Sequence, residues 1–140
     1  MKLKIILDEN ALNPIQAHSN DGGLDLRTPI DVELLPNQSV VIDTGVHIQL
    51  PRNTVGILKS KSGLNVRYGV ITIDGVIDVG YTGSIRVKLY NHGDEAYRFL
   101  RGDKITQLLI LPVKIPNKIN TVFKFKKTDR GDGGFGSSGR

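Results

Sequence analysis

Asp78 and Tyr81 are two side chains in the stretch from Gly75 to Gly83 that could do chemistry, one as a base and the other as a flat surface for a ligand. Apolar residues on both sides of the Asp74-Gly75 break predict a tight β-hairpin that holds the two groups in a fixed relation. The glycines leave the backbone bare enough for a flat ligand to approach. Taken alone, this stretch leaves a structural alternative open, in which Asp78 only caps a turn and Tyr81 only fills a sheet face.

Two earlier stretches carry polar groups that a plain β-structure does not need. In Gly22-Gly23-Leu24-Asp25-Leu26, Asp25 lies between two leucines in a strand-like context, so it either points outward or is buried with a partner. Two lysines, two serines and a glycine fall between Lys59 and Leu64, at a possible helix start where backbone N–H groups favour a phosphate. Each stretch alone also fits ordinary surface structure, because exposed strand carboxylates, surface lysines and helix-capping serines are common.

Two later stretches end the series. Gln107 interrupts an apolar run that follows the turn at Arg101-Gly102-Asp103, and a buried amide needs hydrogen-bond partners from the backbone or from a ligand. The segment from Arg130 to Gly139 combines a guanidinium group, two hydroxyls, glycines and the single aromatic Phe135. A phenylalanine among glycines gains little unless it stacks on something, although a disordered linker is the alternative.

Short apolar runs separated by Gly, Pro, Asn and Asp must position these groups, and their spacing predicts an all-β sandwich or barrel. The runs are Leu3–Leu7, Val32–Leu35, Val40–Ile42, Val46–Leu50, Val55–Leu58, Ile85–Tyr90 and Ile105–Val113. One helix is predicted from Ser62 to Tyr68, with Ser62 as its N-cap and Gly69 as its stop.

Length and composition limit the function classes. A chain of 140 residues predicts one domain, and it contains neither an apolar run as long as a membrane span nor a signal-peptide-like N-terminus. The absence of cysteine excludes disulfides and thiolate metal sites, and it fits a cytoplasmic setting. The net charge of +5 favours an anionic partner such as a nucleotide.

Histidines and aromatic residues argue against two of the remaining classes. His18, His47 and His92 lack the spacing of metal ligands, so we expect ordinary turn or surface histidines. Aromatic residues interleave with lysines only at Phe123 and Phe125, which argues against general nucleic-acid binding.

The five stretches, taken in order, carry a more specific signal than any one of them. They are Gly-Gly-Leu-Asp-Leu, Lys-Ser-Gly-Leu, Gly-Val-Ile-Asp-Val-Gly-Tyr-Thr-Gly, Gly-Asp-Lys-Ile-Thr-Gln-Leu and Arg-Gly-Asp-Gly-Gly-Phe-Gly-Ser-Ser-Gly. In this order they resemble the five-motif signature of the homotrimeric deoxyuridine triphosphatases (dUTPases). The resemblance implies an all-β, distorted jelly-roll-like β-barrel with one short helix over residues 1–128. It also implies a mobile glycine-rich C-terminal arm, residues 129–140, that closes the active site of a neighbouring subunit in a homotrimer.

The resemblance further implies hydrolysis of dUTP to dUMP and pyrophosphate, which limits uracil incorporation into DNA and supplies dUMP for thymidylate synthesis. Asp78 would be the general base for attack of water on the α-phosphorus, with Mg²⁺ held mainly by substrate phosphates and water. Asp25 and Asp103 would support the site, and Tyr81 would pack under the deoxyribose. The implied substrate-binding residues are Lys61, Ser62, Gly63, Gly75, Tyr81, Gln107, Arg130, Phe135, Gly136, Ser137 and Ser138.

Several positions depart from the usual pattern of that family. Lys61 stands where most members have arginine, so a point charge replaces a planar two-pronged donor. Leu24 replaces a common aromatic residue, and Lys104 and Thr106 replace a common arginine and alanine.

Two alternatives to dUTP hydrolysis share the fold. A dCTP deaminase carries a catalytic glutamate before a Leu-x-Asn sequence, whereas this chain has Lys88 before Leu89-Tyr90-Asn91, so deamination ranks low. A nucleotide-responsive regulatory protein remains possible, although the sequence displays no partner surface and no long insertion.

Overall fold

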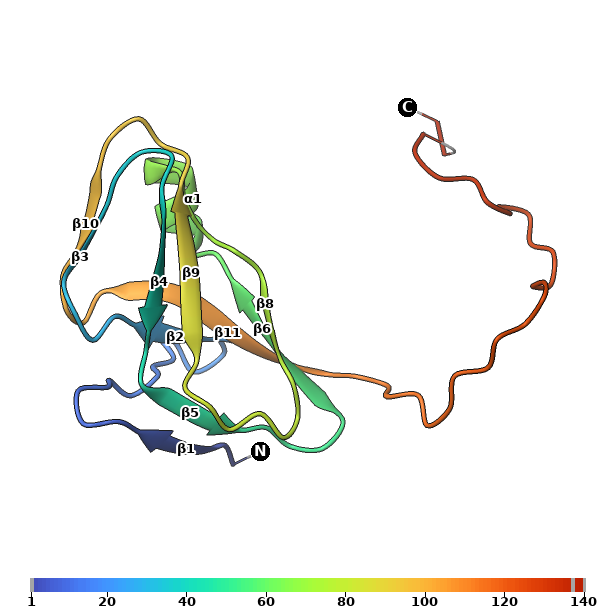
Figure 1. Ribbon diagram of the computed structural model, residues 1–140, viewed down its shortest axis with the longest axis horizontal. Helices are drawn as coiled ribbons and strands as arrows, with labels where there is room; N and C mark the ends of the chain where they lie inside the picture. Colours follow the sequence, from blue (N-terminus) through green and yellow to red (C-terminus); the bar gives the residue numbers. More distant parts are fainter. Residues whose placement is uncertain (1, 137, 140) are drawn as a thin grey trace.

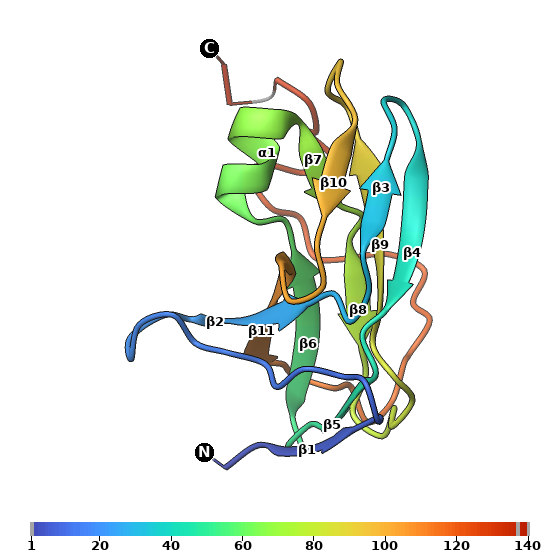
Figure 2. The same ribbon diagram turned by 90° about the vertical axis from the view of Figure 1, so that its left-hand side faces the viewer.

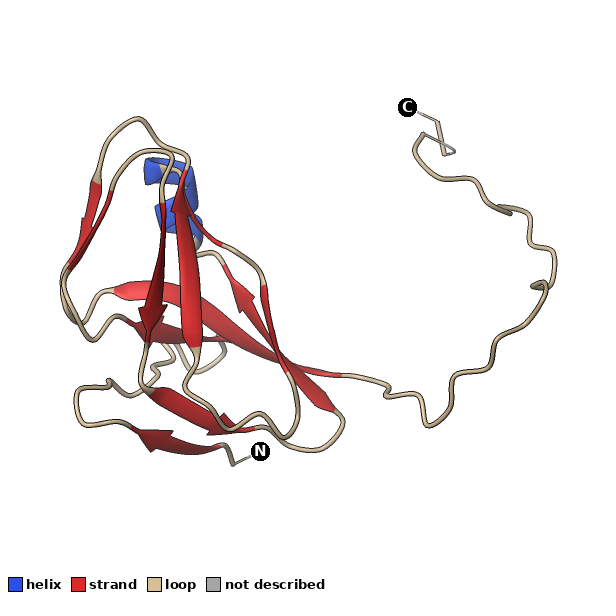
Figure 3. Ribbon diagram, in the orientation of Figure 1, coloured by secondary structure: helices blue, strands red, loops and turns tan. Residues whose placement is uncertain are grey.

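The computed structural model describes residues 2–136 and 138–139, and its regular structure is almost entirely β-strand (Figure 3). The elements in chain order are β1 (Lys4–Leu7), β2 (Gly23–Arg27), β3 (Val32–Leu34), β4 (Ser39–Asp43), β5 (Val46–Gln49), β6 (Thr54–Lys59), α1 (Ser62–Tyr68), β7 (Val70–Thr72), β8 (Gly75–Ile77), β9 (Arg86–Asn91), β10 (Tyr97–Phe99) and β11 (Lys104–Pro112). The predicted all-β class with one short helix is confirmed, since each predicted apolar run overlaps a strand.

The strands form two larger sheets and two small ones. The four-stranded sheet has the order β2-β11-β6-β8 and the three-stranded sheet the order β4-β9-β7. β1 pairs with β5 and β3 with β10, and all of these pairs are antiparallel. Figure 2 shows β2, β6 and β11 on one side of the molecule and β3, β4 and β9 on the other, so the two sides face each other as layers.

Aliphatic and aromatic side chains fill the space between these layers. Leu26 of β2 and Leu108 of β11 are fully buried, as are Val87 and Leu89 of β9 and Phe99 of β10. Alternate residues of β9 are buried, which is the period expected of a strand with one face in the core. The core therefore uses the apolar face of each predicted strand.

Helix α1 follows the prediction in its length and its end, but its start is different. Gly69 ends the helix in the left-handed conformation with φ 69°, which confirms the predicted stop. The predicted N-cap is wrong, because Ser62 is already helical and the cap residue is Lys61. The backbone of Lys61 is still extended as it leaves β6, and its ammonium group pairs with Asp25 instead of capping the helix.

The predicted hairpin between Val70 and Ile77 is wrong, although both of its arms are strands. β7 pairs with β9 in the three-stranded sheet, and β8 pairs with β6 in the four-stranded sheet. Between them the N–H of Ile73 donates to the carbonyl of Lys88 at 2.8 Å. The break at Asp74-Gly75 is therefore a corner between two sheets, because each apolar arm buries its side chains in a different layer of the core.

The chain leaves the sheets after β11. The N–H of Val113 donates to the carbonyl of Asn53 at 2.8 Å, and residues 114–136 and 138–139 form neither helix nor strand. Figure 1 shows this segment extending away from the sheets. Within the described part of the chain, no helix has the length and apolar character needed to cross a membrane. The domain division expected at residue 128 stays a prediction.

Asn91, at the end of β9, ties three parts of the fold together. Its side chain is fully buried and donates to the carbonyls of Leu34 at 3.0 Å and Glu95 at 2.8 Å. Its amide oxygen accepts the N–H of Gly93 at 2.8 Å. One amide therefore bonds three backbone groups, of which the bond to Leu34 is buried and the other two are partly buried.

Replacing Asn91 with alanine should lower the free energy of unfolding by about 2–4 kcal/mol, because it removes three hydrogen bonds, one of them buried and two partly buried. Urea denaturation measures this change. Asn117→Ala, at an exposed position after β11, is the matched control and should leave the urea midpoint unchanged. Equal stability of the two variants would contradict this account of Asn91.

Candidate active site

Asp25 lies in the middle of β2 with a lysine on each of its oxygens. Lys61 Nζ pairs with Oδ1, and Lys104 Nζ lies 2.8 Å from Oδ2. The Asp25 side chain is 7% exposed, so this carboxylate is buried with partners and does not point to solvent. Of the two orientations left open by the sequence, the buried one is correct.

A β-bulge in β11 brings Lys104 to this cluster. Opposite β2, Gln107 pairs with Asp25 and Thr106 with Leu26, but Lys104 instead of Ile105 then pairs with Arg27. Side chains two residues apart on a strand share a face, so Arg27 lies on the face of Asp25. The extra residue therefore shifts Lys104 onto that face, where a regular ladder would put Ile105.

Two opposing effects set the pKa of Asp25. Burial by itself raises the pKa of this carboxyl. Hydrogen bonds from Lys104 and Lys61, together with their positive charges, outweigh the burial and hold the pKa of Asp25 below its ordinary value. Asp25 is therefore ionised at neutral pH and fixes both ammonium groups in place.

Gln107 and Thr106 fix the chain that leads from β6 to α1. Gln107 Nε2 donates to the carbonyl of Ser60 at 3.0 Å, and Thr106 Oγ1 donates to the carbonyl of Lys59 at 2.9 Å. A Cβ at Gly23 would lie 2.8 Å from the Gln107 side-chain oxygen, so a larger residue there would require this amide to shift. Ser62 and Gly63 follow this braced segment and are exposed.

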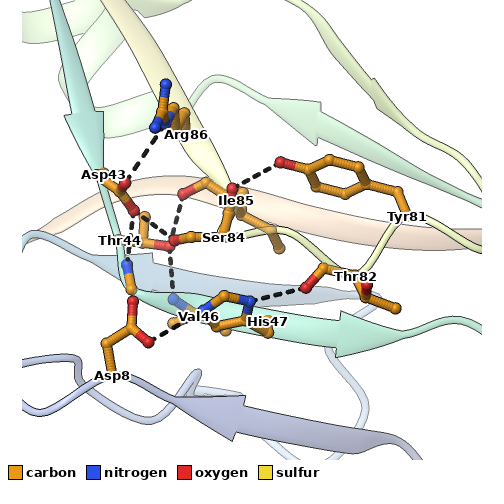
Figure 4. A network of polar contacts seen from close by, with 11 residues as sticks. Asp8, Asp43, Thr44, Val46, His47, Tyr81, Thr82, Ser84, Ile85 and Arg86 are labelled. Carbon is orange, nitrogen blue, oxygen red and sulfur yellow. Dashed lines mark hydrogen bonds and ion pairs between the residues drawn. The ribbon is translucent and has the colours of Figure 1, made fainter.

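Asp78 and Tyr81 lie in a turn between β8 and β9. Asp78 is exposed and its carbonyl accepts the N–H of Tyr81 at 3.1 Å. Tyr81 donates its hydroxyl proton to the carbonyl of Ser84 at 3.0 Å, as Figure 4 shows. The ring covers Gly83, where an added Cβ would lie 2.5 Å from the phenol oxygen. The ring is therefore held in one orientation while Asp78 stays open to solvent.

Asp78 and the Asp25 cluster lie far apart within one chain. Three strand spacings of about 4.8 Å separate β8 from β2. Along the strands, Ile77 pairs with Gly56, whereas Asp25 is level with Gln107 and Lys59. The three residues from Gly56 to Lys59 add about 10 Å. One chain therefore presents two separate groups of the expected site residues.

The other expected residues fall into three cases. Gly75 pairs with Leu58 beside the sheet corner, and Asp103 braces its own turn by accepting the N–H of Leu100 at 2.8 Å.

Phe135 and Ser138 are exposed on the segment that leaves the sheets. On the same segment Gly136 and Arg130 are exposed, and Arg130 Nε donates to the carbonyl of Gly133 at 3.0 Å. Ser137 lies outside the described residues.

Sequence reasoning missed the contacts that hold the Asp78 turn. His47 of β5 contacts the carbonyl of Thr82 and the carboxylate of Asp8, and Ser84 donates to Asp43 of β4 (Figure 4). His47 was expected to be an ordinary surface histidine. Its alternation with buried Val46 and Ile48 was the available signal that it faces outward from β5, but its partners come from distant parts of the chain.

Metal-binding side chains do not cluster in residues 2–136 and 138–139, which contain no group of three His, Asp or Glu residues that could hold an ion. Both oxygens of Asp25 are engaged by lysines. Any metal at this cluster must therefore find other ligands.

The ion pairs of Asp25 should stabilise the fold in a pH-dependent way. Because its folded pKa is lowered, their contribution is complete above the unfolded pKa of about 3.9 and is lost as the pH falls through the folded value. Near neutral pH, Asp25→Asn should cost about 2 kcal/mol in urea denaturation, and the difference from the parent chain should shrink towards about pH 3. Asp74→Asn, whose ion pair with Lys59 is exposed, should change stability little. A cost of Asp25→Asn that does not vary with pH would contradict this role.

Comparison with known proteins connects this geometry to a family. The family model described as dUTPase matches residues 9–139. The chain is 41% identical to the deoxyuridine 5'-triphosphate nucleotidohydrolase of Gloeothece citriformis, covering 99% of this chain and 97% of that protein. It is 40% identical to the enzyme of that name from Clostridium kluyveri, covering 95% and 94%.

Solved structures agree with the sequence comparison. The dUTPase of Staphylococcus bacteriophage 80alpha with dUPNHPP superposes with a TM-score of 0.92 at 30% identity, covering 99% of both chains. A variant of the dUTPase from phage phi11 of S. aureus, described as revealing the coordination of a structural Mg(II) ion, has a TM-score of 0.82 at 28% identity, covering 89% of this chain and 99% of that one. The predicted jelly-roll-like fold is confirmed, and the chain belongs to the dUTPase family.

Proposed function

We propose that this chain is a dUTP diphosphatase whose active sites are completed between the subunits of a homotrimer. Family membership over residues 9–139 supports hydrolysis of dUTP to dUMP and pyrophosphate. The separation of Asp78 from the Asp25 cluster within one chain carries the proposal of shared sites. A substrate that needs both groups must lie between one chain's cluster and another chain's turn.

The cluster around Asp25 suits the triphosphate. A triphosphate carries several negative charges, so its hydrolysis needs cations and N–H groups held around the phosphate chain. Lys61 is anchored by Asp25 through one interaction, and its ammonium has three donors, so donors remain for a phosphate oxygen. Ser62, Gly63 and Gln107 border the same segment and would hold the other phosphate oxygens.

The turn between β8 and β9 suits the reacting end of the nucleotide. Asp78 would accept a proton from the water that attacks the α-phosphorus, in line with the leaving pyrophosphate. The tied ring of Tyr81 would pack under the deoxyribose and leave no room for a 2′-hydroxyl. Main-chain groups near Gly75 would pair with the uracil edge.

The segment after β11 suits a lid. Arg130, Ser137 and Ser138 would bind the γ-phosphate, and Gly136 would let the backbone approach the nucleotide. The fully exposed ring of Phe135 would stack on the base. Closure of this arm over a neighbouring site would exclude bulk water.

The arrangement suits an Mg²⁺ ion that binds together with the substrate. Both oxygens of Asp25 are occupied by lysines and Asp103 braces a turn, so the cluster leaves the ion to phosphate oxygens and water. When bound, the ion would neutralise charge on the phosphate oxygens. Lys61, Ser62 and Gln107 would then orient the phosphate chain that carries it.

The biological role follows from the reaction. Removal of dUTP limits uracil incorporation into DNA and supplies dUMP for thymidylate synthesis. A cytoplasmic location stays a prediction. The comparisons give no support to the dCTP deaminase or the regulatory alternative.

Asp78→Asn tests the base directly, because it keeps the shape of the side chain and removes its basicity. With Mg²⁺ present, it should lower kcat for dUTP by at least about a hundredfold and change the Kd of a non-hydrolysable dUTP analogue by less than about threefold. Asp94→Asn, an exposed aspartate on another turn, is the control. Pyrophosphate release from dUTP, dCTP, dTTP and UTP gives the substrate preference, and ammonia release from dCTP would support the deaminase instead.

A mixture of two inactive chains tests the shared site. Asp78→Asn and a chain ending at Thr128 should each lose activity, but co-refolded trimers should regain it. If Asp78 and the arm of one site come from different subunits, random assortment gives about one quarter of sites with both intact. No recovery in mixed trimers, verified by native mass spectrometry, would show that one chain supplies both groups or that the site is not shared.

A further inference from the structure

His47 is held between two hydrogen-bond acceptors. Its Nδ1 lies 2.8 Å from the carbonyl oxygen of Thr82, and its Nε2 lies 3.1 Å from Oδ1 of Asp8. Thr82 belongs to the turn that carries Asp78, whereas Asp8 directly follows β1 near the start of the chain. Figure 4 shows the imidazole lying between the two. The His47 side chain is 25% exposed, so water has limited access to it.

Both contacts require a proton on the imidazole. A carbonyl oxygen can only accept, and so can an ionised carboxylate. Two good hydrogen bonds therefore need protons on both ring nitrogens, which is the imidazolium form. A neutral ring has one N–H, and it can keep only one of the two bonds while its other nitrogen faces an acceptor.

The surrounding charges favour the same form. The hydrogen bond to the Thr82 carbonyl raises the pKa of His47, burial opposes this, and the charges of Asp8 and Asp43 raise it further. Asp43 is itself paired with Arg86 of β9. Lys4 of β1 lines the same 440 Å³ pocket as His47 and is the charged side chain of opposite sign to these aspartates among the pocket's lining residues.

The turn from Asp78 to Ser84 is fixed at its end and in its middle. At the end, Ser84 Oγ donates to Asp43, and the Tyr81 hydroxyl donates to the Ser84 carbonyl. In the middle, the carbonyl of Thr82, the residue after Tyr81, contacts His47. Without the His47 contact, the backbone between Asp78 and Ser84 would keep only the bonds within the turn and the Ser84 bond to Asp43, so Asp78 and Tyr81 would be held less firmly.

We propose that His47 is a positioning residue for the reaction, in which its doubly protonated ring, held by Asp8, fixes the turn that carries Asp78 and Tyr81. This inference rests on the proposed function of that turn. His47 touches no substrate and acts through the Thr82 carbonyl. We call the two contacts of His47, to Thr82 and to Asp8, the His47 bridge. The bridge is complete below the unfolded pKa of about 6.5 and weakens as the pH rises through the higher folded pKa of His47.

Kinetics of dUTP hydrolysis across pH provide the first test. At about pH 6, His47→Ala should lower kcat by about three- to tenfold, the effect of losing one hydrogen bond that orders the turn. The ratio of parent to variant kcat should fall as the pH rises through the pKa of His47. His47→Gln can donate to Thr82 without titrating, so it should restore part of kcat at every pH. Equal ratios at all pH values would mean a structural role only.

Asp8→Asn tests the other side of the ring without altering His47. It removes the charge that stabilises the imidazolium, so the imidazole pKa measured by NMR should fall and the alkaline decline of kcat should move to lower pH. His18→Ala is the matched control, because it removes an exposed histidine from the loop before β2. It should change neither quantity. An imidazole pKa of His47 that is unaffected by Asp8→Asn would overturn the proposal.

Amide hydrogen exchange of Tyr81, whose N–H donates to the Asp78 carbonyl at 3.1 Å, separates this inference from the proposed function when it is measured in the substrate-free protein. Exchange there should rise at least about threefold in His47→Ala and in the parent chain at alkaline pH, after correction for intrinsic rates. If the parent chain hydrolyses no dUTP but exchange responds as expected, the role of His47 in holding the turn is supported and the proposed function is wrong. If the parent chain is active and His47→Ala changes neither the exchange nor the pH profile, the proposed role of His47 is wrong.

Discussion

The pairing of β11 along both of its edges is the constraint on which the rest of this structure depends. Gln107 is level with Asp25 on one side and with Lys59 on the other. A slip of one residue would turn every side chain of β11 to the opposite face, so it would take Leu108 out of the core. The same register thus specifies the core and assembles the charged cluster, which explains how a small chain keeps a buried carboxylate in a fixed place.

The cluster also explains how lysine can serve at two positions, Lys61 and Lys104, where the resemblance led us to expect arginine. Lysine is a flexible point charge, and an unanchored ammonium would sample many positions. Asp25 removes that freedom by holding Lys61 and Lys104 on its two oxygens. One negative and two positive charges leave the cluster cationic, so the anchor does not cancel the attraction for phosphate.

Much of this organisation was predictable from the sequence, since strands were recognised wherever apolar residues clustered between turn residues. Apart from the helix N-cap, the predictions that failed share one cause: they depended on which strands become neighbours. The apolar arms on either side of Asp74 gave the strands β7 and β8, but not their separate partners β9 and β6. Likewise, the bulge that brings Lys104 beside Asp25 leaves no signature in a run of apolar residues. His47 was missed because its two partners lie about 35 and 39 residues away in the chain, a separation at which pattern reasoning has no information.

Contacts within the chain divide the proposed site into a braced part and a part that must find its order elsewhere. Asp78 and Tyr81 lie on a turn fixed by His47 and by the Ser84 contact to Asp43, so the proposed base, Asp78, would need little reorganisation before it acts. Phe123 and Phe135, in contrast, are fully exposed on a segment without helix or strand. Such rings gain burial only on another surface, and ordering the segment costs about 1–2 kcal/mol per residue. If the segment is the proposed lid, that cost means it closes favourably only when a ligand contributes contacts, so closure would depend on the nucleotide while Asp78 stays in place.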